Sequence, residues 1–135
     1  MKVMTFGTFD ILHKGHEYFL KKAKSFGEYL VVVVARDLTV KKAKGRFPDN
    51  MEQRRLENLK KLGIADEVIF GKLDIDKHKI IEEHKPDIIC LGYDQTIFTE
   101  NLGKELRARG LLPEIIRLKP YKEHKYKSSK IRNKK

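Results

Sequence analysis

Cysteine is nearly absent from this chain, since Cys90 is the only one among 135 residues. A single thiol excludes a disulfide within the chain and favours a reducing compartment, so we expect a cytoplasmic protein. Cys90 lies in the apolar stretch DIICLG, where a small core residue is the expected role.

Long hydrophobic runs are also missing. The longest, YLVVVVA at residues 29–35, is far shorter than the roughly 20 residues that span a bilayer. The opening KVMTF lacks the length and the cleavage pattern of a signal peptide. Neither an internal repeat nor a linker interrupts the chain, so we expect one domain over residues 1–135 and no membrane partner.

Acidic residues are few: 19 stand against 30 basic ones, which leaves a formal charge of +11. Such an excess attracts polyanions, namely nucleic acid, anionic lipid or phosphorylated small molecules. The excess is steepest from Leu118 onward, where Glu123 is the single acid. A solubilising terminus is the alternative interpretation of that tail. A basic nucleic-acid-binding domain is the alternative for the whole chain, although its cations match no recognised reading motif.

Short apolar segments alternate with helical patterns along the chain. Strands are predicted over 3–6, 29–35, 66–70, 87–91 and 114–118, helices over 15–26, 51–62, 78–84, 100–109 and 128–133, and a loop or short helix over 36–50. The run at 29–35 has no polar alternation, which is typical of a strand buried on both faces. The sequence therefore predicts an α/β fold, a single Rossmann-like domain whose five-stranded parallel sheet carries helices on both faces.

The stretch GTFDILHKGH, residues 7–16, stands between the first strand and the first helix. Gly7 allows close approach of the backbone to a ligand, and Thr8 adds a hydroxyl donor. His13 and His16 bracket the helix start, where unpaired amides and the helix dipole favour an anion. Gly15 leaves the space between the two imidazoles open. Together these residues predict a phosphate cradle. Two histidines three apart also suit a metal site, but no third ligand lies at the usual spacing; ordinary helix-cap residues are the other alternative.

The same stretch resembles the signature of the HxGH nucleotidyltransferases, which include cytidylyltransferases and phosphopantetheine adenylyltransferase. The resemblance covers nearly the whole chain, because further segments occur in family order: FGEYLVVVVARD, KGRFPDNMEQRR, ADEVIFG, KPDIICLGYDQ and the final SSKI. It is strongest to the short single-domain branch that contains glycerol-3-phosphate cytidylyltransferase, heptose-phosphate adenylyltransferase domains and archaeal FAD synthase.

The resemblance implies transfer of a nucleoside monophosphate from a triphosphate to a phosphate acceptor, with release of pyrophosphate. The protein must then hold two anions in line and stabilise charge on the transferring phosphorus. It implies that His13 and His16 contact the phosphates and stabilise the transition state. The resemblance also implies that Gly7 and Thr8 line the nucleotide phosphates and that Phe9 and Asp10 form the floor of the site. Asp10 is implied to lie toward the acceptor as well.

Two cations are implied to assist. Lys44 lies where related sequences place a lysine that binds substrate phosphate; the neighbouring Lys41, Lys42 and Arg46, or a merely solvated basic loop, are the alternatives. Arg54 matches a family arginine near the acceptor or the phosphates, with the adjacent Arg55 as the alternative match.

Further binding residues are implied at the ends of later segments. Asp94 matches an aspartate near the base or ribose, with Tyr93 and Gln95 beside it. Ser128 and Ser129 match a hydroxyl pair that opens the last helix and binds the β- and γ-phosphates. The preceding KEHKYKSS departs from the RTEGIST-type segment of cytidylyltransferases, so a lysine would replace their arginine; the candidates are Lys122, Lys125 and Lys127.

Asp37 in ARD and the GYDQ loop resemble archaeal FAD synthase more than the glycerol-phosphate enzymes. The resemblance therefore implies transfer of AMP from ATP to FMN, with Asp37 on the acceptor side. Glycerol-3-phosphate cytidylyltransferase and a heptose-type sugar-phosphate adenylyltransferase are the alternatives. Mg²⁺ or another divalent cation is expected with ATP, and a homodimer is compatible with the resemblance. The aromatic candidates for a flavin wall are Phe47, Tyr93, Phe98, Tyr121 and Tyr126.

Overall fold

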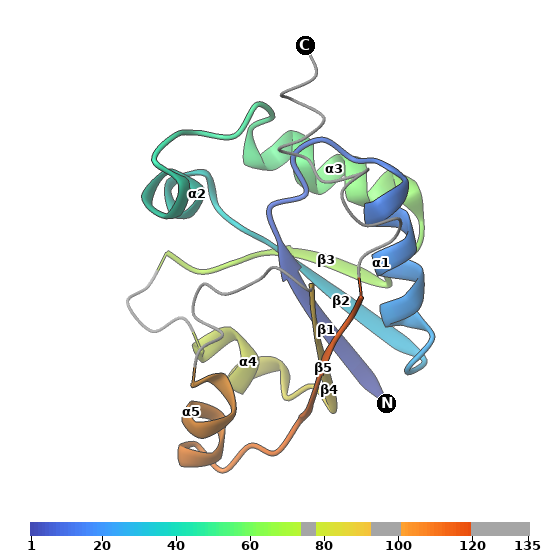
Figure 1. Cartoon of the computed structure of the whole chain (residues 1–135), viewed down its shortest axis with the longest axis vertical. Coiled ribbons are helices and arrows are strands. Elements are labelled where there is room, and N and C mark those ends of the chain that lie inside the picture. Colours follow the sequence, from blue (N-terminus) through green and yellow to red (C-terminus); the bar gives the residue numbers. More distant parts are fainter. Residues whose placement is uncertain (74–77, 93–100, 120–135) are drawn as a thin grey trace.

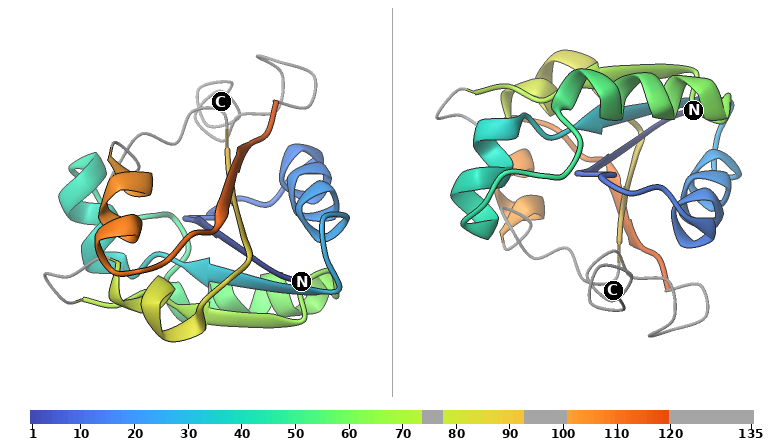
Figure 2. Two further views of the ribbon diagram at one scale, coloured as in Figure 1. Left: turned by 90° about the horizontal axis from the view of Figure 1, so that it is seen from below. Right: turned by 90° about the horizontal axis from the view of Figure 1, so that it is seen from above.

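Five parallel strands form one sheet, and helices cover both of its faces (Figures 1 and 2). The structure is a computed structural model that describes residues 1–73, 78–92 and 101–119. Its strands are β1 (Lys2–Gly7), β2 (Tyr29–Val34), β3 (Glu67–Phe70), β4 (Ile88–Leu91) and β5 (Glu114–Arg117). Its helices are α1 (Lys14–Lys24), α2 (Asp37–Lys44), α3 (Glu52–Leu62), α4 (Lys79–His84) and α5 (Leu102–Ala108).

The strand order β3-β2-β1-β4-β5 places β1 at the centre of the sheet. The chain runs outward from β1 to β3 and then returns to the other side of β1 to form β4 and β5. Every strand pair is parallel, so the predicted Rossmann-like fold is confirmed. The strand order reverses between β1 and β4, and parallel α/β sheets bind ligands at the carboxyl ends of the strands at such a point.

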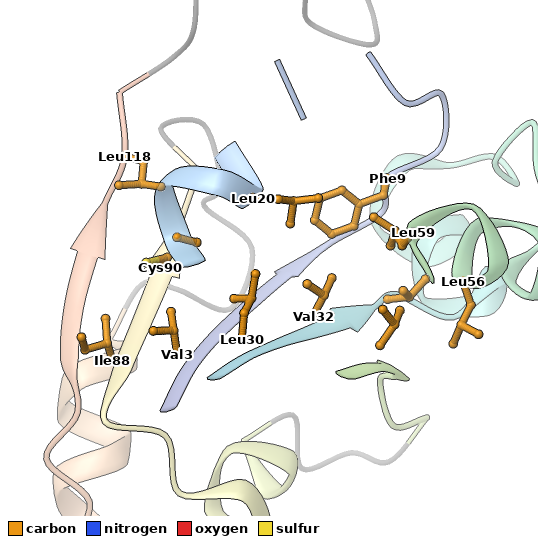
Figure 3. Packing of buried hydrophobic residues seen from close by; sticks show 13 residues of the cluster. Val3, Phe9, Leu20, Leu30, Val32, Leu56, Leu59, Ile88, Cys90 and Leu118 are labelled. Carbon is orange, nitrogen blue, oxygen red and sulfur yellow. The ribbon is translucent and has the colours of Figure 1, made fainter. Parts of the chain in front are cut away.

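The two faces of the sheet pack against different helices. Val32 points to the cluster that contains Leu20 of α1 and Leu56 of α3 (Figure 3), whereas Val33 points to the cluster beneath α4 and α5. Successive residues of a strand face opposite sides of a sheet. The unbroken valine run of β2 therefore supplies both cores at once.

Cys90 lies in the α1 and α3 cluster and is fully buried, as predicted. Burial raises the pKa of its thiol to about 11, so the thiol stays protonated at neutral pH. An inert core role follows, because the thiolate is the reactive form.

The bounds of the described strands and helices differ from the predicted ones by at most two residues. The helix predicted over 15–26 ends at Lys24, because the N–H groups of Phe26 and Gly27 bond the carbonyls three residues back, those of Ala23 and Lys24, and no longer those four residues back. The segment 36–50 forms α2 and then a loop, and Gly45 ends the helix in the left-handed conformation with φ 80°. The helix predicted over 128–133 lies outside the described residues. No helix within the described ranges is long and apolar enough to cross a membrane.

Candidate functional site

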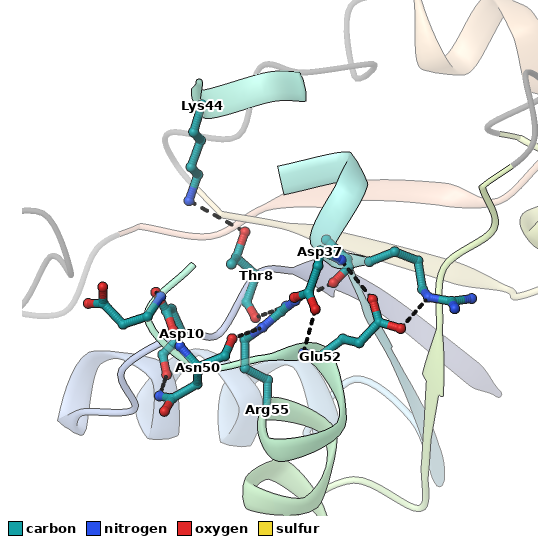
Figure 4. A network of polar contacts seen from close by, with 10 residues as sticks. Thr8, Asp10, Asp37, Lys44, Asn50, Glu52 and Arg55 are labelled. Atoms are coloured by element: carbon teal, nitrogen blue, oxygen red, sulfur yellow. Dashed lines mark hydrogen bonds and ion pairs between the residues drawn. The ribbon is translucent and has the colours of Figure 1, made fainter. Parts of the chain in front are cut away.

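Three segments meet at the carboxyl ends of β1 and β2 (Figure 4). They are the loop that follows β1, the start of α2, and the loop over 45–51 that leads into α3. The predicted residues Thr8, Asp10, Asp37 and Lys44 all lie here. Sequence segments that are far apart are thus brought to the edge of the sheet where a ligand is expected.

The two histidines of the motif lie face to face. Their ring centroids are 4.0 Å apart with the planes 34° from parallel. His13 caps α1, because its Nδ1 accepts the backbone N–H of Gly15 at 3.0 Å. Since Nδ1 is an acceptor, the proton of a neutral His13 lies on Nε2. The capping alternative and the phosphate-binding interpretation are therefore compatible, since one ring nitrogen caps the helix and the other carries the donor.

Both imidazoles are neutral at pH 7. Burial lowers the pKa of His13. It also lowers the pKa of His16 to about 4, with the charges of His13 and Lys44 acting in the same direction and the backbone of Ile11 opposing them. An arriving polyphosphate would supply the negative charge that these rings lack and would raise both pKa values.

Gly7 is required by the ring of Phe9. A Cβ at position 7 would lie 2.7 Å from Phe9 Cε2, well inside van der Waals contact. Phe9 has a φ of 52°, is 5% exposed, and meets the His16 ring edge-on at a centroid distance of 5.6 Å. Phe9 therefore supports His16 from the core side.

Lys44 is the lysine of its segment that turns toward the loop after β1. Its ammonium donates to Thr8 Oγ1 at 3.4 Å, and its charge acts on the pKa of His16. Lys41 instead lies over the ring of Phe47, 5.3 Å from the centroid. The structure thus brings the predicted Lys44, and not Lys41, to the cradle.

Asp10 faces the protein. Its side chain is 3% exposed, and its two carboxylate oxygens accept the backbone N–H groups of Asp49 and Asn50 at 2.7 and 2.8 Å. The Asn50 side chain returns a hydrogen bond to the Asp10 carbonyl. Asp10 therefore holds the loop over 45–51 against the loop after β1.

Asp37 belongs to a second network, between α2 and α3. Its carboxylate accepts the N–H of Glu52 at 3.2 Å, and the Glu52 carboxylate accepts the N–H of Asp37 at 2.8 Å, so each caps the other helix. Arg36 donates to Glu52 at 2.9 Å. Arg55 is fully buried and pairs with Asp37 at 2.7 Å, whereas Arg54 is exposed on α3. Of the two arginines weighed from the sequence, the structure brings Arg55 to this network.

Sequence reasoning missed Asn50 and Glu52. Their positions in the sequence could have indicated them, because both stand at the start of a predicted helix, where polar side chains bond unpaired backbone N–H groups. Their partners come from other segments, so the signal would have suggested a cap and not this network.

No group of three potential metal ligands occurs within the described ranges. The carboxylates of Asp10 and Asp37, which lie among the three segments that form the site, already bond to protein groups. The described residues therefore form no cage for a divalent cation. Tyr93, Asp94, Ser128 and Ser129, together with the three candidate tail lysines, lie outside the described residues.

Residues 4–134 match the family described as cytidylyltransferase-like. The chain belongs to that family. It is 46% identical to the FAD synthase of Pyrococcus horikoshii over 132 residues, which is 97% of this chain and 89% of the relative. It is 48% identical to the FAD synthase of Ferroglobus placidus over 119 residues, which is 87% of this chain and 76% of the relative.

A solved structure has the same fold. The fold matches that of a lipopolysaccharide core biosynthesis protein from Thermoplasma volcanium with a TM-score of 0.83 and 41% identity, covering 90% of this chain and 98% of the other. The nucleotidyltransferase family predicted from the HxGH motif, and the resemblance to archaeal FAD synthases, are therefore confirmed.

Proposed function

We propose that this chain transfers AMP from ATP to FMN, which gives FAD and pyrophosphate. The observation that carries the proposal is the near full-length similarity to archaeal FAD synthases, in a chain whose paired histidines lie at the carboxyl end of β1. The enzyme class is a nucleotidyltransferase, as the family match indicates.

In the proposed reaction, a phosphate oxygen of FMN forms a bond to the α-phosphorus of ATP. The bond between that phosphorus and the bridging oxygen breaks, and pyrophosphate leaves with the electron pair. The protein forms no covalent bond; it aligns the two anions and stabilises the charge that develops on the transferring group. The triphosphate would occupy the cradle formed by the loop after β1 and the start of α1.

Specific groups fit these roles. Nε2–H of neutral His13 and the ring of His16 would donate to phosphate oxygens, and a nearby anion would favour their protonation as negative charge builds up. The Lys44 ammonium, beside Thr8, would neutralise charge on a substrate phosphate. The exposed Arg54 remains a proposed acceptor contact. Asp10 and Asp37, predicted on the acceptor side, would act by holding the surrounding loops.

Magnesium is expected as part of the MgATP substrate, whose phosphate oxygens supply most of its ligands. Tyr93 and Asp94 are proposed at the base and ribose, and Ser128 and Ser129 at the β- and γ-phosphates. A homodimer and a cytoplasmic location stay predictions. Sedimentation of the purified protein would test the first.

The deciding assay is pyrophosphate release with ATP or CTP, each against FMN, glycerol 3-phosphate and a sugar 1-phosphate, with magnesium. Turnover with ATP and FMN alone is the expected result. The second candidate function is a sugar-phosphate nucleotidyltransferase, which the name of the Thermoplasma volcanium structure favours. Turnover with the sugar 1-phosphate would support it. Tight RNA or DNA binding without any turnover would favour the basic binding-domain alternative and overturn the proposal.

A further inference from the structure

Arg55 is the one charged side chain with no exposed surface among the described residues. Its guanidinium donates through Nε to the Asn50 carbonyl at 2.9 Å and through Nη1 to the carbonyls of Thr8 and Ala35 at 2.9 and 2.8 Å. Through Nη2 it donates to Asp37 at 2.7 Å (Figure 4). One side chain thus contacts all three segments that form the site.

These contacts lie where the geometry of the site is decided. Thr8 belongs to the loop after β1 and Ala35 follows β2 directly. Asp37 begins α2, which carries Lys44 at its other end, and Asn50 lies in the loop that leads into α3. The Arg55 contacts therefore set the position of α2 relative to the loop after β1. Lys44 meets Thr8 across that junction.

The charge balance permits this burial. Arg55 faces Asp37, and the outer pair Arg36 and Glu52 completes a set of two cations and two anions. A buried guanidinium is tolerated when its donors are satisfied and its charge is paired. The planar fork of arginine presents donors in several fixed directions, which the single ammonium of lysine lacks.

We propose that Arg55 is a positioning residue for nucleotidyl transfer, which aligns Lys44 on α2 with the phosphate cradle at Thr8. The inference rests on the proposed function, because it assigns a role at the same site. Arg55 contacts no substrate in this role. It acts through the segments that do.

The test is Arg55→Lys, which keeps the charge but loses the fork, compared with the native protein well below the melting temperature of either. Because small misplacements of reacting groups are costly, we expect kcat to fall about 10- to 100-fold. The KM for ATP should change less than about threefold, since the phosphate-binding groups themselves remain. Arg55→Met should be at least as impaired.

The matched control is Asp66→Asn. Asp66 accepts the Leu30 N–H and pairs with Lys24 at the opposite end of the sheet, so its loss should destabilise the fold and leave kcat unchanged. If Asp66→Asn lowers kcat as much as Arg55→Lys at a matched loss of stability, the role is merely structural and the proposal fails. It also fails if Arg54→Lys is impaired and Arg55→Lys is not.

A second measurement is independent of turnover. The imidazole NMR signals of His13 and His16 report the geometry of the cradle in the free protein. They should shift in Arg55→Lys and stay in place in Asp66→Asn. Unshifted signals would overturn the positioning role. An inactive native protein with shifted signals in Arg55→Lys would instead refute the proposed function and leave the positioning of the cradle by Arg55 standing.

Discussion

The two ends of the sheet use the same contact, a carboxylate that accepts backbone N–H groups, in different surroundings. At the amino end, Asp66 accepts the Leu30 N–H at 2.8 Å and Asp87 accepts the Lys2 N–H at 2.7 Å. Both contacts tie the start of one strand to the turn that precedes a neighbouring strand. The Asp66 side chain is one-third exposed, so water shares in solvating its charge.

At the carboxyl end, the carboxylates are less exposed, and their partners lie in the loop before α3 and in α3 itself. Asp10 is 3% exposed and bonds the loop before α3, and Asp37 pairs with the fully buried Arg55. Among the described residues, this end alone brings two imidazoles face to face, those of the partly buried His13 and His16, with the exposed Lys44 nearby. An aspartate that follows a strand is therefore not by itself evidence of a ligand-binding residue. The paired imidazoles of His13 and His16, with the Lys44 ammonium beside Thr8, distinguish the candidate site from the scaffold.

The variant His16→Ala tests most directly whether the carboxyl end of the sheet carries the chemistry. Loss of a donor to the transferring phosphate should reduce turnover by about 10²-fold or more, with a smaller effect on nucleotide binding. Pyrophosphate release and ATP titration measure the two. The control is His84→Ala on α4, a histidine on the other face of the sheet, which should retain native turnover. Unchanged turnover in His16→Ala would remove this residue from the mechanism.

The burial difference between the two ends predicts a difference in stability. Asp10→Ala should lower the free energy of unfolding by about 2–3 kcal/mol, because two partly buried N–H groups lose their charged acceptor. Asp66→Ala should cost roughly 1 kcal/mol or less, since an ion pair near the surface contributes little. Urea denaturation of both variants measures this. Equal losses would show that burial does not separate the two ends.

Gly7 and Gly71 test the crowding at the ends of β1 and β3. Gly7→Ala should destabilise the fold by about 1–2 kcal/mol and lower turnover, because the new methyl displaces Phe9 and, through it, His16. Gly71→Ala is the control, since its Cβ would lie 3.5 Å from its nearest neighbours, an ordinary contact. Thermal melting and pyrophosphate release report the two effects. Native behaviour of Gly7→Ala would contradict the supporting role of Phe9.

The smallest expected effect is the dependence of stability on pH. The pKa of His16 is about 4 in the folded chain and near 6.5 when unfolded, so the unfolded state binds more protons between these values. The free energy of unfolding should therefore fall as pH drops from 6.5 toward 4, by about 1 kcal/mol at pH 5 after solvent screening. His16→Gln should show a flatter profile in urea melts. An unchanged profile would assign the pH dependence to other groups.

Much of the fold could be predicted from local pattern. The valine run of β2 and the spacing of apolar residues in α1 show directly which residues will be buried. The alternation of strands and helices implies a parallel sheet. The end of α1 was harder to predict, because it depends on the bonds of the Phe26 and Gly27 N–H groups to carbonyls three residues back, which the neighbouring helix formers do not reveal.

The site was predictable where its chemistry lies within one short segment. The sequence GTFDILHKGH, together with the further segments in family order, predicted the family, which the comparisons confirm. The same stretch predicts a phosphate cradle, because the chain places Gly7, His13 and His16 at a strand-to-helix junction. The direction of each carboxylate and the choice between Arg54 and Arg55 were decided only by the tertiary structure. Adjacent residues on a helix point about 100° apart, so the packing of α3 against the sheet turned one arginine into the core and left the other in water.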